Sequence, residues 1–414
     1  MTSATGSGVA TKRDYDYIVL GLGGIGSGAA YWLARRAGAE VLGLEQYEFN
    51  HDKGASEDHS RIIRLAYEKP AYVELAHHSY TAWRAVEEDA GDGEPLIVIT
   101  GGLDLFPPAS SAVPMQDFVD SMIAHDVPFE RLDAAETMRR YPQFRLDEGT
   151  VSFYQARSGF ASAHACNAAH QRLARRHGAT LLDNTPVTAI APLADGVEVT
   201  TPSATYRCRR LVVTADAWTN EVLRPLGVRL PLTCTQEQVA YYASPRLRDY
   251  QPDRFPIWIW RDNPNFYGIP VSGEERGVKV AQDVGGREVT PATRTFEPNG
   301  ETLARVDSFM RRHLPTARGP IVSAKTCMYT MPPDRDFVID TLPDYPRVSL
   351  ALGAGHGFKF ASIIGRVLSE LAIDGATAYN IAPFAVDRPL LTMENAPRVF
   401  EPYLEKNREL VDSR

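Results

Sequence analysis

"YDYIVLGLGGIGSGAAYWLARRAGAEVLGLEQ", residues 15–46, contains two apolar runs separated by a glycine-rich turn and a helical pattern. The first run, residues 17–20, is typical of a buried parallel strand. Apolar residues then recur at helical spacing, and Gly38 stands where that helix is expected to end. The second run, residues 41–44, predicts another strand. The order strand, turn, helix, strand predicts the first unit of a doubly wound α/β domain.

Gly21, Gly23 and Gly26 form the pattern GxGxxG between the first strand and the helix. The first glycine permits a tight turn, the second lets the backbone approach a pyrophosphate, and the third lets helix and strand pack closely. Glu45 ends the second strand, where a carboxylate can accept hydrogen bonds from ribose hydroxyls. A dinucleotide site is therefore predicted, although this pattern does not distinguish NAD from FAD. The alternative is a glycine-rich turn that binds nothing. The predicted contacts in this stretch are Gly21, Gly23, Gly24, Ile25, Gly26, Glu45 and Gln46.

The composition describes a globular chain long enough for two domains. Of its 414 residues, 44% are hydrophobic and 23% are charged, and chains of this length usually divide into two domains. The net charge of −8 argues against nucleic acid or an anionic membrane as the main partner. No run approaches the roughly 20 apolar residues of a membrane span. Residues 1–13 are small and polar, which predicts a disordered tail rather than a secretion signal.

The four cysteines, at positions 166, 208, 234 and 327, are far apart and form no CxxC pair. Neither a disulfide scaffold nor a metal site is expected from them. A reducing compartment suits such a chain, so the expected location is the cytoplasm.

Parallel and antiparallel patterns follow one another along the rest of the chain. Residues 204–223 combine a buried strand with a helix, and residues 348–375 repeat the order strand, glycine turn, helix. Between residues 225 and 320, short β-like runs are separated by Pro, Gly and Asn, which is typical of antiparallel strands. The chain is predicted to form a parallel βαβ domain interrupted by a mostly antiparallel one.

Three further motifs resemble a known family when taken together with the glycine turn. They are "SRIIRLAYEK" at residues 60–69, "CMYT" at residues 327–330 followed by "DFVID", and "GAGHGFKF" at residues 353–360. In this order they resemble the monomeric sarcosine oxidase family of flavoproteins, which also includes N-methyltryptophan and pipecolate oxidases. The similarity extends from about residue 15 to about residue 390.

The resemblance implies an α/β fold in which a Rossmann-type FAD-binding domain is interrupted by a mostly antiparallel β-sheet substrate domain. It also implies a monomer. The FAD-binding domain is expected at residues 14–90, 150–220 and 321–390, the substrate domain at residues 91–149 and 221–320, and a C-terminal extension at residues 391–414.

The resemblance also implies that Cys327 carries the FAD through a thioether to the 8α-methyl group of the flavin. A thiolate is a good nucleophile toward an electron-poor ring, so the attachment is chemically reasonable. The alternative, from the residue alone, is a buried structural cysteine.

The resemblance also implies roles for three cations. Arg64 and Lys359 are expected to bind the substrate carboxylate, and Arg61 to face the flavin. The planar fork of an arginine suits a carboxylate, and a lysine in the first turn of a helix needs a compensating anion. The alternatives are a solvated arginine face and a surface lysine.

Lys279 alternates with Val278 and Val280 and therefore points to the opposite strand face. The plain interpretation is a solvent-facing lysine. The resemblance implies instead that its charge stabilises superoxide as oxygen takes the first electron.

Tyr267 is expected to line the substrate pocket, although a core tyrosine is equally compatible with "NFYGIP". The remaining cofactor contacts implied by the resemblance are Ser60, Arg61, Ile63, Val187, Ala217, Trp218, Met328, Gly355, Gly357, Phe358 and Lys359.

Some positions depart from the pattern of the family. Asp283 and Glu57 replace histidines, and the strand pair that lines the pocket of the family has become "IWIW", with Trp258 and Trp260. These carboxylates and indoles indicate a larger or more basic amine than sarcosine. Asp216 stands where a glycine is usual and has no explanation in the sequence.

The favoured hypothesis is an oxidase of a secondary or N-methyl α-amino acid. A hydride would pass to FAD, the imine would hydrolyse, and O₂ would be reduced to H₂O₂. The alternatives are a flavin dehydrogenase with another electron acceptor, an oxidase of a cyclic, larger or glycated amine, a pyridine-nucleotide dehydrogenase, and a catalytically silent dinucleotide-binding protein. The expected partners are an amine that bears a carboxylate and molecular oxygen.

Overall fold

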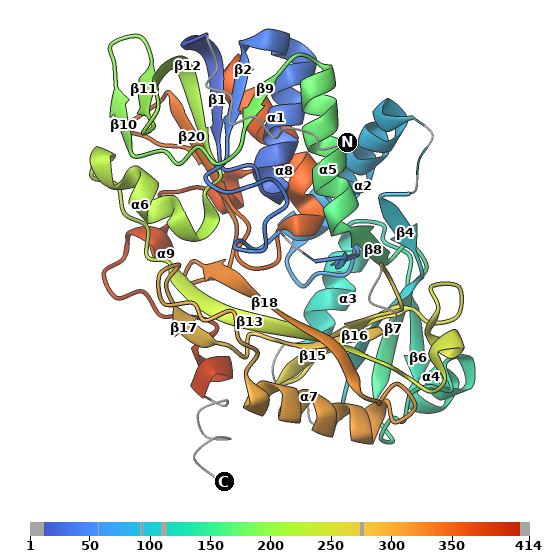
Figure 1. The fold of residues 1–414 in the computed structure, drawn as a ribbon. Helices are drawn as coiled ribbons and strands as arrows, with labels where there is room; N and C mark the ends of the chain where they lie inside the picture. The colour runs from blue at the N-terminus through green and yellow to red at the C-terminus, as the bar shows by residue number, and fades with distance from the viewer. Residues whose placement is uncertain are drawn as a thin grey trace.

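The computed structural model describes residues 12–56, 58–91, 93, 95–108, 114–273 and 277–405. Its elements form two parts, one around an eight-stranded sheet and one around a nine-stranded sheet, with a small third sheet between helices and strands of both (Figure 1). The two ends of the described chain lie in different parts.

The eight-stranded sheet has a parallel centre. Strand β1 (Asp14–Leu20) pairs in parallel with β2 (Val41–Leu44) and with β12 (Thr205–Val213), and β20 (Val348–Leu352) continues the parallel pairing beside β12. The outer strands are β9 (Thr180–Leu182), β10 (Ala189–Pro192), β11 (Val197–Thr200) and β19 (Val338–Thr341). The helices of this part are α1 (Gly24–Ala37), α2 (Pro70–Ala90), α5 (Ala163–Arg176), α6 (Thr219–Leu223), α8 (Ala361–Asp374) and α9 (Pro389–Thr392).

Both faces of this parallel sheet are covered, which explains the uninterrupted apolar runs of its strands. Val19 of β1 packs toward the cluster that includes α1, α5 and α8, whereas Ile18 and Leu20 pack on the opposite face with Leu223 and Leu391. The strand, turn, helix and strand predicted for residues 15–46 are confirmed as β1, α1 and β2, and Gly38 ends α1 with a φ of 56°.

The nine-stranded sheet follows the order β17–β13–β16–β15–β14–β5–β7–β6, with β18 also beside β13. Its strand pairs are antiparallel except for β14 and β5. Its strands are β5 (Gly102–Phe106), β6 (Glu130–Asp133), β7 (Val151–Gln155), β13 (Thr233–Tyr242), β14 (Ile257–Trp260), β15 (Asn265–Ile269), β16 (Val278–Asp283), β17 (Arg287–Val289) and β18 (Ile321–Met331), and its helices are α3 (Met115–Ala124), α4 (Ala134–Arg140) and α7 (Gly300–His313). The third sheet joins β3 (Ser60–Ile63), β8 (Gly159–Ser162) and β4 (Ile97–Ile99).

Sheet membership differs from the expected domain boundaries at two strands. Strands β7 and β18 were expected in the FAD-binding domain, but they pair with β5, β6 and β13 of the nine-stranded sheet. The physical reason is that antiparallel partners are chosen across space, so a boundary drawn from local pattern misses them. No helix among the described residues is long and apolar enough to cross a membrane.

Residues near both ends of the described chain contact the fold. Residues 1–11 lie outside the described residues, but Lys12 pairs with Glu40 and Arg13 lies over the ring of Tyr206. Lys12 and Arg13, the last two residues of the predicted tail, therefore contact the fold before β1 begins. At the other end, residues 391–405 pack back onto the protein, and Phe400 is 1% exposed.

Candidate functional site

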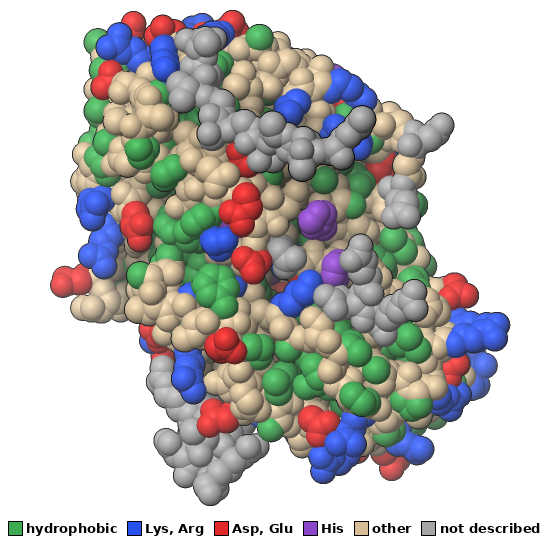
Figure 2. Space-filling view, in the orientation of Figure 1, with side chains coloured by type: hydrophobic (Ala, Val, Ile, Leu, Met, Phe, Trp, Pro, Cys, Tyr) green, Lys and Arg blue, Asp and Glu red, His purple; other side chains and the backbone are tan. Residues whose placement is uncertain are grey.

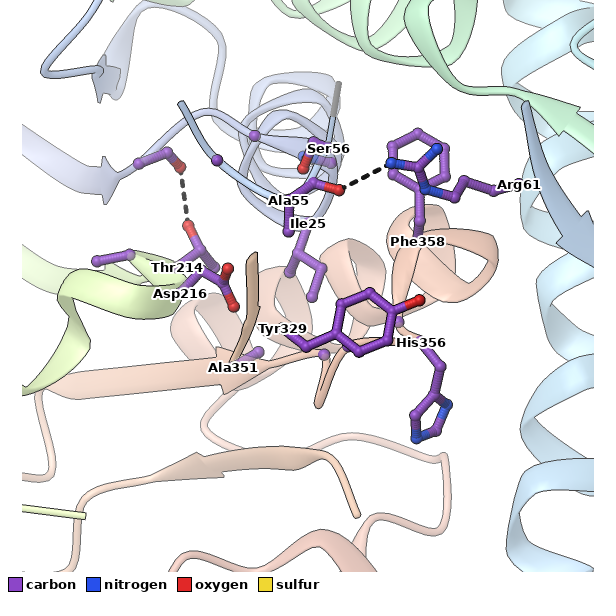
Figure 3. A pocket seen from close by; sticks show the side chains of 18 of the residues that line it. Ile25, Ala55, Ser56, Arg61, Thr214, Asp216, Tyr329, Ala351, His356 and Phe358 are labelled. Carbon is purple, nitrogen blue, oxygen red and sulfur yellow. Dashed lines mark hydrogen bonds between the residues drawn. The ribbon is translucent and has the colours of Figure 1, made fainter. Parts of the chain in front are cut away.

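A cavity of about 670 Å³ extends from the glycine turn to residues of the nine-stranded sheet. Figure 3 shows Thr214 and Asp216 at one end of the stretch drawn, Arg61 and Phe358 at the other, and Tyr329 between them. On the face in Figure 2, acidic, basic and histidine side chains stand close together near the middle of the molecule. Elements far apart in the chain therefore share one cavity.

The glycine turn has the geometry that its sequence predicts. Gly21 has a φ of 87°, and a Cβ added at Gly26 would lie 1.8 Å from the carbonyl oxygen of Gly21, so only glycine fits either position. The amide of Gly24 donates to the hydroxyl of Ser56 (2.8 Å). The carboxylate of Glu45 is 5% exposed and accepts from the amides of Leu22 (2.8 Å) and Tyr47 (3.2 Å). The turn is thus held in place from two sides.

The residues around the turn fit a bound dinucleotide. Gly21, Gly23, Gly24, Ile25, Glu45 and Gln46 all line the cavity, as do Val187 and Trp218. Two buried acceptors there, Oδ1 of Asn167 and Oδ2 of Asp216, have no hydrogen-bond partner among the described residues. Hydroxyl groups of a ribose or ribityl chain are donors that can satisfy such acceptors. The chemistry of this end therefore agrees with the FAD that the sequence implies.

Asp216 is one of the departures noted in the sequence, and the structure gives it a position. It has a φ of 43° and lines the cavity, where it accepts a hydrogen bond from the hydroxyl of Thr330. Burial raises the pKa of its carboxyl to about 6. At neutral pH this carboxyl is mostly ionised and can accept hydrogen bonds from a ligand in the cavity.

Several predicted cofactor contacts do not line the cavity themselves. Gly26 packs against the turn, Ile63 is 1% exposed in the core, and Met328 of β18 is fully buried. Ala217 stands next to the cavity-lining residues Asp216 and Trp218. The predicted contacts that do line it, besides those near the turn, are Ser60, Arg61, Arg64, Tyr267, Gly355, Gly357, Phe358 and Lys359.

Cys327 lies on β18 two residues before Tyr329, so both side chains project from the same face of the strand. Tyr329 lines the cavity, whereas Cys327 stands beside it, opposite Glu237 of β13. Burial raises the pKa of the Cys327 thiol to about 11, although the nearby cations Arg61 and Lys279 favour the thiolate. The thiol is free and predominantly protonated at neutral pH.

Arg64 and Lys359 both line the cavity, and the charge of Arg64 acts on Lys359. Arg64 is 8% exposed, lies over the ring of Tyr67 (3.9 Å), and its Nη1 has no hydrogen-bond partner among the described residues. Lys359 is 9% exposed, and its Nζ donates to the carbonyl oxygen of His356 (2.9 Å). Burial, and then the charge of Arg64, hold the pKa of Lys359 well below its ordinary value. Two buried basic side chains therefore line one cavity, and neither forms an ion pair with a carboxylate among the described residues.

Neighbouring cations in the same region do have carboxylate partners. Arg261 donates through Nε to Asp104 (2.8 Å) in a buried pair. Arg335 donates to Asp283 (2.8 Å), so the carboxylate that replaces a family histidine is already neutralised. Asp283 lines the cavity but does not leave an uncompensated negative charge there.

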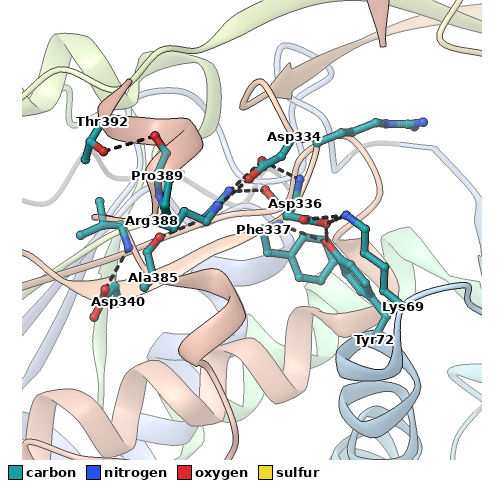
Figure 4. Close-up of polar contacts among 12 residues, drawn as sticks. Lys69, Tyr72, Asp334, Asp336, Phe337, Asp340, Ala385, Arg388, Pro389 and Thr392 are labelled. Carbon is teal, nitrogen blue, oxygen red and sulfur yellow. Dashed lines mark hydrogen bonds and ion pairs between the residues drawn. The ribbon is translucent and has the colours of Figure 1, made fainter. Parts of the chain in front are cut away.

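Charged residues also join the elements at the rim, as Figure 4 shows. Asp336 accepts from Lys69 (2.7 Å) and from the hydroxyl of Tyr72 (3.0 Å), which ties the start of α2 to the loop after β18. Asp334 accepts from Arg388 (2.6 Å) just before α9. These contacts fix the loop that carries Arg335.

Lys279 is buried, which excludes the solvent-facing alternative. Its side chain is 1% exposed, and its Nζ donates to Asp58 and to the carbonyl oxygen of Ser60 (2.7 Å). Asp58 also accepts from Arg61 (3.1 Å) and from the hydroxyl of Tyr241. We name Lys279, Arg61, Asp58 and Tyr241 the Asp58 cluster. The cluster lies near Cys327, because both of its cations favour the thiolate form of that thiol.

The expected contribution of Trp258 and Trp260 to the pocket is wrong. Both indoles point away from the cavity and pack against Phe309 of α7. Ile259 between them lines the cavity instead, because side chains alternate along a strand. Tyr267, opposite Ile259 on β15, also lines it, and burial raises the pKa of its hydroxyl. Glu57 lies outside the described residues.

Sequence reasoning missed three features of the site. Asp58 precedes the motif "RIIR", and its acidic character was the available signal. Arg335 lies in the gap between "CMYT" and "DFVID", and only the fold brings it to Asp283. Phe400 and Tyr403 of the C-terminal segment line the cavity, and no local pattern indicates this.

Comparison with known proteins agrees with this geometry. The family described as "FAD dependent oxidoreductase" matches residues 16–371. The chain is 38% identical over 378 residues to a monomeric sarcosine oxidase of Streptomyces avermitilis, covering 89% of this chain and 96% of that protein. It is 32% identical over 381 residues to an N-methyl-L-tryptophan oxidase of Yersinia pestis, covering 91% of this chain and 99% of that protein. Among solved structures, the open form of NikD, an unusual amino acid oxidase essential for nikkomycin biosynthesis, superimposes with a TM-score of 0.81 at 29% identity, covering 90% of this chain and 98% of that one.

Proposed function

The chain belongs to the family of FAD-dependent oxidoreductases, and we propose that it oxidises a secondary or N-methyl α-amino acid and passes the electrons to O₂. FAD, when bound, supplies the hydride acceptor and the site at which O₂ is reduced to H₂O₂. The product is an imine, which hydrolyses in water. The relatives and the buried side chains of Arg64 and Lys359 in the cavity support this substrate class.

The observation that carries this proposal is the buried pair of Arg64 and Lys359. Burying like charges without a counter-charge is costly, so the pair favours an anionic ligand. A carboxylate bound there accepts from the partnerless Nη1 of Arg64 and from Nζ of Lys359. It also raises the pKa of Lys359 back toward its ordinary value, because an opposite charge favours the ammonium. The carboxylate of an α-amino acid is the proposed occupant.

The same cations remove the need for a strong protein base. A protonated amine is disfavoured among Arg64, Lys359, Arg61 and Lys279, so the substrate amine binds in its neutral form. Neutral nitrogen is the form that can release a hydride from the adjacent carbon. Tyr267 remains protonated because burial raises the pKa of its hydroxyl, and it therefore acts as a donor toward the substrate. Positioning and fixed charge supply the rate acceleration.

We also propose that Cys327 bonds the flavin covalently and that Lys279 assists the reaction with O₂. Cys327 lies beside the cavity with Arg61 and Lys279 nearby, which supports both roles. The positive charge of Lys279 stabilises the negative charge that oxygen acquires with its first electron. A cytoplasmic monomer remains our prediction.

A panel of N-methyl, cyclic and primary amino acids, assayed for H₂O₂, tests the proposed activity. Secondary amino acids should produce peroxide and imine-derived carbonyl product in equal amounts, and their uncharged amides should be poor substrates. The purified protein should also be yellow, and its colour should remain in the pellet after acid precipitation. Absence of peroxide with every secondary amino acid, while a dye accepts the electrons, would show a dehydrogenase instead.

A further inference from the structure

We infer that Asp58 is a positioning residue that keeps Lys279 charged and fixed for the reaction with oxygen. This inference rests on the proposed role of Lys279. Asp58 is 4% exposed and receives three side-chain donors, namely Nζ of Lys279, Nη1 of Arg61 and the hydroxyl of Tyr241. It is the only carboxylate paired with Lys279 in the described part of the chain.

The backbone at Asp58 has a conformation that residues other than glycine rarely adopt. Its φ is 103°, and its Oδ1 accepts from the amide of His59 (2.8 Å). Such a conformation is strained and persists only where surrounding contacts hold it. Here four hydrogen bonds to the carboxylate hold the backbone in this conformation. The turn before β3 is thus built to hold this carboxylate against Lys279.

The electrostatic consequence concerns the charge of Lys279. Burial lowers the pKa of Lys279, Asp58 raises it and the charge of Arg61 lowers it, and together they bring it to about 8. The groups that face Lys279 are Asp58 and Arg61 from the β3 region, Tyr241 on β13, and Cys327 on β18. Asp58 is held ionised, with its pKa below the ordinary value, because Lys279 and Arg61 outweigh the effect of burial. Without Asp58, a buried lysine next to an arginine loses its proton at neutral pH.

The charge of Lys279 sets how the rate of reoxidation by O₂ depends on pH. Below its pKa the lysine is charged and assists oxygen, and above it the assistance is lost. In the wild-type holoenzyme, the rate constant for reoxidation of the reduced protein by O₂ should fall as pH rises through about 8. In Asp58→Asn the same fall should occur at least about one pH unit lower, since loss of a close opposite charge shifts a pKa by roughly one to three units. Lowering the pH should therefore rescue Asp58→Asn.

The test is stopped-flow reoxidation by O₂ between pH 5.5 and 10, with anaerobic reduction measured on the same samples. Lys279→Met should be slow at every pH and lack the transition, and Asp104→Asn, which removes the carboxylate of the other buried pair, should keep the wild-type midpoint. If Lys279→Met reoxidises like the wild type, the proposed role of the lysine fails. If Lys279→Met is slow but Asp58→Asn keeps the wild-type midpoint, the inference about Asp58 fails alone.

A uniform loss of rate in Asp58→Asn at all pH values would indicate a merely structural role and would also overturn the inference. Should Asp58→Asn not fold, the wild-type profile still decides, because a rate constant that does not change between pH 6 and pH 10 contradicts it. Tyr241→Phe removes one donor and keeps the charge of Asp58, so its midpoint should stay near that of the wild type.

Discussion

The two groups of buried cations around the cavity differ in the source of their counter-charge. In the Asp58 cluster the protein supplies a carboxylate to Lys279 and Arg61. At the other group, Arg64 and Lys359 have no such partner in the described residues. A cation with a protein carboxylate keeps its position and charge through the reaction cycle, whereas one without it is ready for a charged ligand. The comparison separates a fixed electrostatic function from a binding function.

The largest expected effect concerns Lys279 of the Asp58 cluster. Lys279→Met should slow reoxidation by O₂ by about 100- to 1,000-fold, the usual loss when a preorganised charge is removed from a developing anion. Anaerobic reduction by substrate should change little, because the substrate carboxylate is bound elsewhere. Stopped-flow spectroscopy of the two half-reactions measures both, and equal slowing of both steps would remove the distinction between the groups.

The next effect concerns Arg64 and Lys359, the proposed carboxylate-binding residues. Arg64→Met or Lys359→Met should lower kcat/KM for an amino acid by about 30-fold or more, since losing one partner of a buried charge pair costs roughly 2–5 kcal/mol. The uncharged amide of the same substrate should be affected far less. Lys69→Met is the matched control, because Lys69 pairs with Asp336 at the rim and is half exposed, where an ion pair contributes little. A similar loss for the acid and its amide would contradict carboxylate binding.

A further prediction concerns the rate of flavin attachment at Cys327, which lies near the Asp58 cluster. The pKa of its thiol is raised to about 11 by burial, and the reactive form is the thiolate. Covalent incorporation of FAD into apoprotein should therefore accelerate by about tenfold per pH unit between pH 7 and pH 9. Acid-insoluble flavin sampled over time measures it, and Cys327→Ser should retain none. Incorporation that is independent of pH would indicate that proton loss from the thiol does not limit attachment.

The smallest catalytic effect is expected away from both groups. Trp258→Phe removes buried atoms that pack against α7, so it should lower the free energy of unfolding by about 0.5–3 kcal/mol and leave the ranking of substrates unchanged. Ile259→Ala, one residue along the same strand, should alter that ranking because its side chain lines the cavity. Denaturant titration and a substrate panel distinguish the two. A changed ranking in Trp258→Phe would show that the indole reaches the substrate.

Local features of the site were predictable from sequence. The turn at Gly21–Gly26, the strands beside it and the helix after it follow from glycine geometry and apolar periodicity, which act between near neighbours. The placement of Arg64, Lys359 and Tyr267 at one cavity followed from resemblance to a family, and the structure places all three there. The direction of Trp258 and the partner of Asp283 were not predictable, because each depends on strand register and on segments far away in the chain.

The sequence by itself determined that residues 15–46 form a strand, a glycine turn, a helix and a second strand, because apolar periodicity and the glycines of the GxGxxG pattern act between near neighbours. Only the tertiary structure decided which cations have partners. Asp58 meets Lys279 across 221 residues, and Arg335 meets Asp283 across 52. Pairing of this kind is a matter of distance in space and of burial, which together set the charge each side chain carries.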